Sequence, residues 1–99
     1  MLHVYITFPT NEEAKKLGRI LIKEKLAKCI NIHKIFSIYP WKGRLCEEDE
    51  FVMLAKTSER KYKKLEKRIK ELHSYELPPI VAIKVEKGHR KFISWVEDV

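Results

Sequence analysis

The chain of 99 residues is long enough for one domain, spanning 1–99, and too short for two. Its 44% hydrophobic residues exclude an intrinsically disordered chain, and its 35% charged residues exclude a membrane protein. No apolar run approaches the roughly 18 residues that a membrane-spanning helix needs. The first residues alternate in polarity and lack the regions of a signal peptide, which predicts a cytoplasmic protein.

The charge balance is strongly basic, with 21 Lys and Arg against 14 Asp and Glu and a net charge of +7. A basic surface permits nucleic-acid or anionic partners but does not require them. Gln is absent, and Asn11 and Asn31 are the only asparagines. Abundant Lys and Glu with few amides is the composition of proteins from hot environments. We therefore favour a solvated surface of a thermophile protein over a nucleic-acid-binding surface.

Residues 2–8 alternate between apolar and polar side chains, which predicts a strand with one buried face. Thr10 and Glu13 then match the capping box of a helix start. Apolar residues at spacings of three and four follow and predict an amphipathic helix over 11–26.

Two strands are predicted in the middle of the chain, over 29–39 and 46–57, with Pro and Gly turn signals between them. The first strand alternates in polarity. The centre of the second, Phe51–Ala55, does not alternate, which indicates burial on both faces.

The two cysteines are predicted to be free thiols. With a turn near Lys42-Gly43, residue numbers across the hairpin add up to about 85, so Cys46 opposes Tyr39 and Cys29 opposes Lys56. The thiols then lie on the order of 30 Å apart at about 3.3 Å per residue, which excludes an intrachain disulfide. Free thiols fit a reducing compartment.

The remaining elements are a helix over 58–72 capped by Thr57 or Ser58, a strand over 80–86 and a short terminal helix near Trp95. The full order of elements is that of the split βαβ arrangement. It predicts an α+β fold, a ferredoxin-like βαββαβ sandwich in which two helices cover one face of a four-stranded antiparallel sheet.

The uncovered sheet face is predicted to be apolar. Both sides of the segment 51–55 are hydrophobic, and Tyr5, Tyr39 and Trp41 fall outside the helix-facing set. An apolar face open to water marks an interaction surface, so we expect homo-oligomerisation. A ligand or a nucleic acid that covers this face is the alternative.

Five spaced motifs give the chain a family resemblance: Ala27–Ile32, Ser37–Gly43, Glu50–Thr57, His73–Pro78 and Phe92–Trp95. Together they resemble the CutA divalent-cation-tolerance family over essentially the whole chain. The resemblance implies a ferredoxin-like subunit in a tight homotrimer built through long hairpins, similar in architecture to the PII signal proteins. It also implies a cytoplasmic role in heavy-metal tolerance, with copper the metal most often named, and no established enzymatic reaction.

The resemblance also implies a set of binding residues in clefts between subunits. Trp41, Lys56, Tyr75 and Glu76 are the expected ligand-binding residues, and His73 is the expected metal ligand. No cofactor is expected to be obligatory, and a divalent metal ion such as copper is the expected occupant.

The chain departs from the family pattern at several positions. The usual His-Pro-Tyr is His73-Ser74-Tyr75 here, and an aromatic that is usually Tyr is Phe92. Some members carry a thiol and a second His where this chain has Ile6 and Leu72.

Apart from this resemblance, the residues show few motifs of metal-binding or catalytic sites. The four His and two Cys do not fall at zinc-binding spacings, and no nucleophile elbow or phosphate-binding loop is present. The acidic run Cys46–Glu50 would attract divalent cations without selectivity, but we favour a solvated strand edge that resists edge-to-edge pairing. We therefore expect a protein that is not an enzyme.

Three functions follow from the sequence, in this order. The first is a non-enzymatic trimer in divalent-metal tolerance. The second is a PII-like module that binds a small anionic metabolite between subunits, suggested by Lys56 and the basic segment 58–72. The third is a nucleic-acid-binding domain, which is disfavoured because Phe51-Val52-Met53 lacks the basic context of RNA-binding strands.

Overall fold

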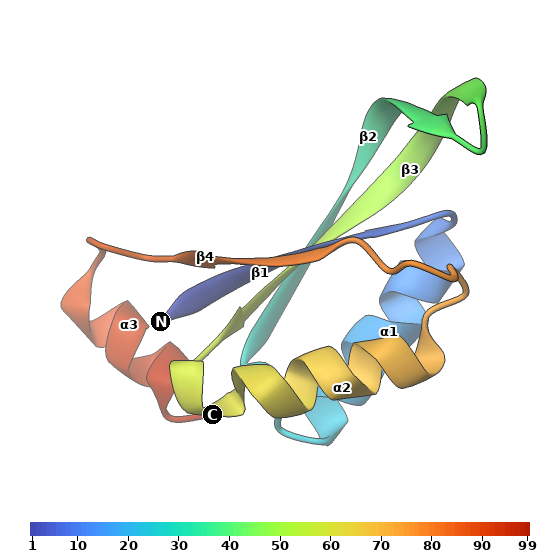
Figure 1. The fold of residues 1–99 in the computed structure, drawn as a ribbon. Coiled ribbons are helices and arrows are strands. Elements are labelled where there is room, and N and C mark those ends of the chain that lie inside the picture. Colours follow the sequence, from blue (N-terminus) through green and yellow to red (C-terminus); the bar gives the residue numbers. More distant parts are fainter.

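The computed structural model describes every residue from Met1 to Val99. Its elements are β1 (Leu2–Phe8), α1 (Asn11–Lys23), β2 (Cys29–Trp41), β3 (Arg44–Thr57), a 3-10 turn (Glu59–Lys61), α2 (Tyr62–Leu72), β4 (Ile80–Lys84) and α3 (Arg90–Glu97). The strands form one antiparallel sheet in the order β2-β3-β1-β4, and α1 and α2 lie against one face of it (Figure 1). This is the predicted ferredoxin-like sandwich with its C-terminal helix.

The core lies between the sheet and the two long helices. Alternate residues of β1 point into it, and Val4, Ile6 and Phe8 have no exposed surface. The apolar stripes of α1 and α2 meet them through Leu17, Leu21, Leu65 and Ile69. Burying each such side chain contributes about 1.5–3 kcal/mol, so the patterns that predicted the elements also hold them together.

Helix α1 begins as predicted but ends earlier. The Thr10 hydroxyl accepts a hydrogen bond from the Glu13 backbone N–H over 3.1 Å. The helix stops at Lys23 because Lys25 takes a positive φ of 57°, and the Leu26 N–H then bonds to the Leu21 carbonyl. This is a Schellman-type ending, which turns Leu26 into the core without a further helical turn.

Ser58 occupies the expected N-cap position of the second helical segment, but neither expected hydroxyl makes a capping hydrogen bond. The Thr57 hydroxyl donates to the Leu26 carbonyl over 2.7 Å, and the buried Ser58 hydroxyl has no partner. The segment starts with the 3-10 turn and becomes α-helical only at Tyr62. The last strand is also shorter than predicted and ends at Lys84.

Strands β2 and β3 form the predicted hairpin in the predicted register. Cys46 lies opposite Tyr39, and Cys29 lies opposite Lys56. Strand β2 continues to Trp41 and β3 begins at Arg44, so both strands are longer at the turn than predicted. Lys42 and Gly43 alone make the turn, with φ values of 50° and 76°. Positive φ at both positions is what a tight two-residue hairpin turn requires.

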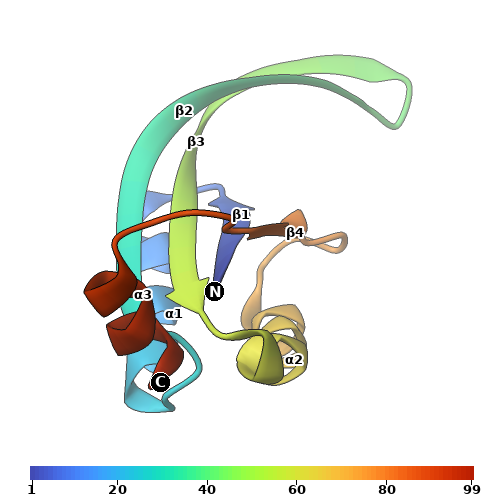
Figure 2. The ribbon, with the colours of Figure 1, turned by 90° about the vertical axis from the view of Figure 1, so that its left-hand side faces the viewer.

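About half of the hairpin extends beyond the rest of the sheet. Strand β1 pairs with β3 only from Phe51 to Thr57, so the hairpin from Ile35 to Glu50 has no further strand beside it. The molecule therefore measures 45 × 26 × 21 Å. Figure 2 shows this extension arching over the side of the sheet that carries β1 and β4.

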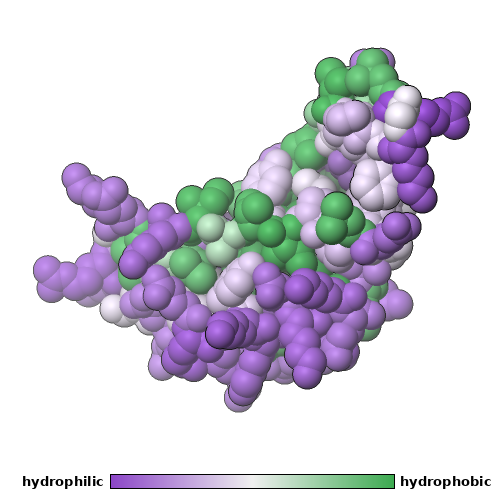
Figure 3. Space-filling view, viewed as in Figure 1, coloured by the Kyte–Doolittle hydropathy of each residue, from purple (hydrophilic) through white to green (hydrophobic).

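The apolar surface predicted opposite the helices is present in part. Val81 and Ile83 of β4 are 55% and 54% exposed on that face, beside Tyr5 and His3 of β1. The centre of β3 is covered, however, since Val52 has no exposed surface. Further exposed apolar side chains lie on the hairpin: Phe36, Ile38 and Leu45. Figure 3 shows hydrophobic surface both across the middle of the molecule, above the polar α2 side, and at the hairpin tip. None of the three helices combines the length and hydropathy that crossing a bilayer demands.

Candidate functional site

A half-open cavity of about 830 Å³ lies under the arch of the hairpin. One wall is the concave face of β2 and β3, and the opposite wall comes from β1 and the segment that connects α2 to β4. The side chains that give the cavity its character are aromatic or acidic: Tyr5, Tyr39, Trp41, Glu50, Tyr75 and Glu76. This volume lies within the roughly 300–1,000 Å³ typical of small-molecule sites.

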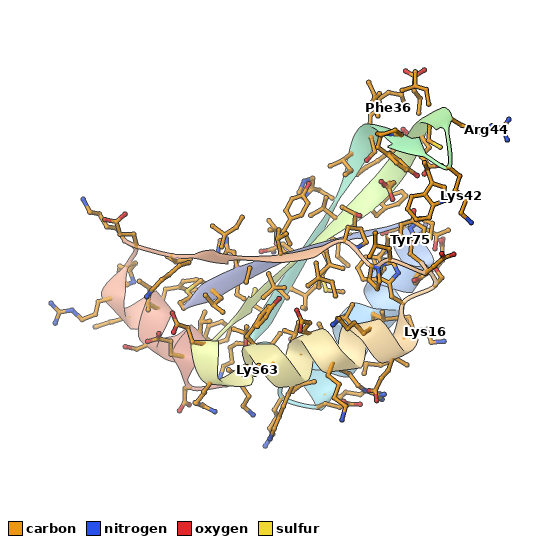
Figure 4. All side chains as sticks on the ribbon, in the orientation of Figure 1. Lys16, Phe36, Lys42, Arg44, Lys63 and Tyr75 are labelled. Atoms are coloured by element: carbon orange, nitrogen blue, oxygen red, sulfur yellow. The ribbon has the colours of Figure 1, made fainter.

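Glu50 and Tyr75 join the two walls. The Tyr75 hydroxyl donates to Glu50 Oε2 over 2.5 Å, and Glu50 is only 5% exposed. Burial and then the bond to the Glu50 carboxylate raise the pKa of Tyr75 well above its ordinary value, so the hydroxyl keeps its proton and remains a donor. Figure 4 shows Tyr75 below the hairpin tip, on the side of Lys42.

A second tyrosine–glutamate pair lies further along the same face of the hairpin. The Tyr39 hydroxyl donates to the Glu48 carboxylate, and this bond is the main cause that raises the pKa of Tyr39 to about 12. Since side chains alternate along a strand, Glu48 and Glu50 face the cavity while Glu47 and Asp49 face the other way.

The solvated-edge interpretation of the acidic run is therefore wrong for Glu50. Strand β1 pairs with β3 only as far as Phe51, so this edge of β3 is open at Glu50, but the Glu50 side chain is 5% exposed and accepts a hydrogen bond from Tyr75 on the concave face. Sequence reasoning missed this residue, although the alternation that places Glu50 and Tyr39 on one face was available in the pattern.

The hairpin tip contacts the segment after α2. The Lys42 ammonium lies 5.7 Å from the centre of the Trp41 ring and 3.9 Å from Glu76 Oε2. Three of the expected ligand-binding residues, Trp41, Tyr75 and Glu76, thus line one cavity within a single chain.

His73 lies beneath this cavity and is fully engaged. Its Nε2 donates to the Thr7 carbonyl over 2.7 Å, and its Nδ1 accepts the Tyr75 N–H over 3.0 Å. The ring stacks on Phe8 with centroids 4.6 Å apart, and the side chain has no exposed surface. As folded here, His73 has no ring nitrogen free for a metal ion, and it positions Tyr75 instead. The expected metal role therefore stays a prediction, and it requires that one of these two hydrogen bonds break.

Glu13 is a further positioning residue that the sequence did not reveal. Its carboxylate accepts the Ser74 N–H over 3.0 Å and the Ser74 hydroxyl over 2.7 Å. It does not complete the capping box with Thr10, because it faces the segment after α2. A proline in place of Ser74, as in the family motif, would supply neither donor.

Lys56 lies at the opposite end of the sheet from the cavity. It pairs with Cys29, and Trp41 is at the other end of β2, about 40 Å farther along the strand at roughly 3.3 Å per residue. The Lys56 ammonium donates to Asn31 Oδ1 over 2.5 Å and lies 5.6 Å from the Phe92 ring centre. A single chain therefore does not bring Lys56 together with the other expected ligand-binding residues.

No three His, Cys, Asp or Glu side chains of the chain gather into a group that could hold a metal ion. The two cysteines are free, as predicted. Near one of them, burial and then the charge of Lys56 lower the pKa of His3, which favours its neutral form.

Comparison with known proteins identifies the family. The family model described as "CutA1 divalent ion tolerance protein" matches residues 2–99. The chain belongs to the CutA1 family. The divalent-cation tolerance protein CutA of Thermus thermophilus is 38% identical over 96 residues, which cover 96% of this chain and 93% of that protein.

Solved CutA structures agree with the fold. The "periplasmic divalent cation tolerance protein CutA" of Archaeoglobus fulgidus superimposes with a TM-score of 0.92 at 38% identity, covering 97% of this chain and 95% of the other. The "PII-like protein CutA" of Nostoc sp. PCC 7120, solved in its apo form, gives a TM-score of 0.92 at 35% identity, covering 99% and 95%. The resemblance to the CutA family that the motifs indicated is therefore confirmed.

Proposed function

We propose that this CutA1-family chain acts as a non-enzymatic homotrimer in tolerance of, or response to, divalent heavy-metal cations, and that it acts by binding. The family assignment supports the cation role. The main support for a homotrimer is the apolar surface that a single chain exposes to solvent, above all Val81 and Ile83 on β4. Large exposed apolar patches on a small domain are typical of surfaces that another chain covers.

The assembly is tested by sedimentation equilibrium of the purified protein. A trimer has three times the 11.8 kDa mass of one chain. A folded particle that keeps the mass of one chain at micromolar concentration overturns the trimer.

Copper is the metal we propose, and His73 is its expected ligand. Because both ring nitrogens of His73 are bonded in the folded chain, a metal ion can bind either nitrogen only after the hydrogen bond of that nitrogen breaks. Calorimetric titration with Cu²⁺ tests this step. The His73→Ala variant is expected to lose affinity and the exposed His33→Ala control to keep it. An affinity that His73→Ala leaves unchanged removes His73 from the site.

The hairpin cavity is the proposed ligand site of each subunit. Trp41, Tyr75 and Glu76 line it, and Lys56 joins it only if a neighbouring subunit places its sheet end against the hairpin. Cross-linking between cysteines introduced at position 56 of one subunit and position 76 of another tests this geometry, since a disulfide requires closely spaced Cα atoms. A bond that forms only within the assembly supports the shared site, and no bond under oxidising conditions rejects it.

The cytoplasm is the proposed compartment. Support comes from the two free cysteines, which fit a reducing environment. The relative from Archaeoglobus fulgidus carries the word periplasmic in its name, so the compartment needs its own experiment. Cell fractionation followed by immunodetection is expected to recover the protein with cytoplasmic markers, and recovery outside the cytoplasm would reject the proposal.

A second candidate function, a PII-like module for a small anionic metabolite, is supported by two adjacent lysines. The Lys28 N–H bonds to the Lys56 carbonyl over 2.9 Å, and both side chains end over aromatic rings of α3. Thermal-shift measurements with nucleotides and phosphorylated metabolites test this function. A shift that Lys56→Gln abolishes supports it, and no shift with any of these anions counts against it.

A further inference from the structure

Glu50 and Lys56 point to the same face of β3, the face that α1 and α2 leave uncovered. The segment 51–55 separates them, so at about 3.3 Å per residue their Cα atoms lie about 20 Å apart. That separation is far beyond the reach of an ion pair. The two charges therefore cannot meet within one chain.

Each of the two side chains also lacks a counter-charge from its own chain. Glu50 is 5% exposed and accepts one hydrogen bond, from Tyr75. Lys56 is half-buried, and its ammonium donates to Asn31 Oδ1 over 2.5 Å but has no carboxylate within ion-pair distance. Burying a charge without an opposite charge is unfavourable, so both residues favour a partner from outside the chain.

The apolar surface on β4 lies beside Lys56. Ile83 is opposite His3 on β1, and His3 is opposite Lys56 on β3, so the three residues form one row across the sheet. Neighbouring strands are about 4.8 Å apart, which places Ile83 about 10 Å from Lys56. A second copy that covers Val81 and Ile83 therefore lies within reach of the long Lys56 side chain.

The concave face of the hairpin is the complementary surface. Glu48 and Glu50 face it, and the cavity beside it is lined mainly by hydrophobic residues, with no Lys or Arg among them. It thus offers a second copy an apolar surface for Val81 and Ile83 and a carboxylate for Lys56. Docking the sheet end of one copy under the hairpin of another buries the apolar side chains and pairs the charges in one contact.

The two surfaces are different, and every chain carries both of them. Contact between them is therefore head-to-tail, and such contacts close into a ring when the rotation between copies allows it. In a closed trimer each subunit gives its hairpin to one neighbour and its sheet end to the other. The same pair of charges then recurs at every interface.

We propose that the Lys56 ammonium of one subunit pairs with the Glu50 carboxylate of the next, so that each ligand site is completed by two chains. This inference rests on the proposed homotrimer and names the contact that the second chain contributes to the site. Lys56 is a positioning residue of the interface, whereas Trp41 and Tyr75 line the site itself. Since the completed site forms only on assembly, a ligand that binds there stabilises the trimer.

Charge reversal with rescue tests the pair. Sedimentation equilibrium measures the protein concentration at which the trimer dissociates, with the same urea concentration in every sample if the wild-type trimer is too tight without it. Lys56→Glu and Glu50→Lys each place like charges opposite one another, so each should shift the protein toward the mass of one chain. The double variant Glu50→Lys/Lys56→Glu restores opposite charges and should reassemble. Glu47→Lys is the matched control, since it adds the same charge on the opposite face of β3 and should not rescue Lys56→Glu.

Neutral variants keep the test independent of folding defects in the reversed ones. Glu50→Gln and Lys56→Gln should each raise the dissociation concentration by at least about tenfold. The double neutral variant should add no more than about twofold to the larger single effect, because the pair is already lost. Glu47→Gln added to Lys56→Gln should leave the dissociation concentration of Lys56→Gln unchanged. Circular dichroism verifies that each variant keeps its fold.

The outcomes separate this pair from the proposed function. A wild-type protein that sediments as a single chain overturns the trimer and the pair together. A wild-type trimer that Lys56→Glu leaves intact, or in which the effects of the two neutral substitutions multiply, overturns the pair and leaves the trimer standing. A folded double reversal that stays dissociated also overturns the pair, whereas its reassembly supports it.

Discussion

Ser74 donates both its backbone N–H and its hydroxyl to one carboxylate, that of Glu13, over 3.0 and 2.7 Å. The contact ties the first turn of α1 to the residue that precedes Tyr75. It therefore fixes the segment that carries two of the cavity residues, Tyr75 and Glu76.

Replacing Glu13 with Ala is expected to lower the free energy of unfolding by about 1–3 kcal/mol, since hydrogen bonds to a charged group are lost on a half-buried side chain. Glu12→Ala removes the same charge from an exposed neighbour in the same helical turn and should cost less than about 0.5 kcal/mol. Guanidinium unfolding at one protein concentration measures both. Equal losses for the two variants would show that the contact with Ser74 contributes nothing.

The Tyr75→Phe variant is expected to be less stable by about 1–3 kcal/mol, because the buried Glu50 carboxylate loses its one hydrogen-bond donor. Tyr62→Phe is the control, since the Tyr62 hydroxyl also donates to a glutamate, Glu66, but at a half-exposed site. Its loss should be smaller than about 1 kcal/mol. The same unfolding experiment decides between them, and a larger loss for Tyr62→Phe contradicts the expectation.

Alkaline pH should weaken the concave face of the hairpin. The pKa of Tyr39 is raised in the folded chain to about 12, from an ordinary value of 10.0. The stabilisation from its protonated hydroxyl is therefore complete below about pH 10 and is lost as the pH rises through about 12. Tyrosinate absorbance should show a step near pH 12 that disappears in Tyr39→Phe, while Tyr62 and Tyr75, whose pKa values are also raised, still titrate late. A step near pH 12 that keeps its full amplitude in this variant would contradict the assignment to Tyr39.

Replacing His73 with Ala is expected to cost about 2–4 kcal/mol in metal-free protein, because the ring packs on Phe8 and bonds to two backbone groups. His33→Ala, at an exposed position of β2, should change stability little. Thermal unfolding in the presence of a chelator measures this structural role separately from any role in metal binding. A metal-free His73→Ala protein as stable as wild type would refute the structural role.

A charge on the exposed face of β4 should break the proposed assembly. Val81→Glu places a carboxylate on the apolar surface that we expect a neighbouring chain to cover, and its sedimentation should shift toward the mass of one chain. Lys63→Glu introduces the same residue on the exposed side of α2 and should leave the assembly unchanged. If Val81→Glu sediments like wild type, this surface is not the contact.

Much of the fold followed from local patterns. Alternation in 29–39 and the turn signal at Lys42-Gly43 were sufficient to predict the hairpin and its register. Once the turn is placed, the partner of every residue on the opposite strand is fixed. Helix ends were predicted less well. The end at Lys23 depends on the positive φ of Lys25, a residue without the usual preference for that conformation.

The site was harder to predict because it depends on contacts between distant segments. Glu50 belongs to a charged run that is typical of a solvated surface, and it becomes buried only because the hairpin arches over Tyr75. Motif resemblance grouped Lys56 with Trp41, although the length of β2 separates them within one chain. The spacing of residues in the sequence predicts which face of a strand each side chain occupies. It does not predict the curvature of the hairpin, which determines which of these faces lines a cavity.

The two-residue turn of the hairpin also suggests an order in which the chain folds. Strands β2 and β3 are neighbours in sequence and can zip together from their turn with little loss of chain entropy. The pairing of β1 with β4 joins the first strand to the last and must close almost the entire chain, so it is expected to form late. Until β4 docks, one edge of β1 is unprotected, and newly synthesised chains are then most exposed to aggregation.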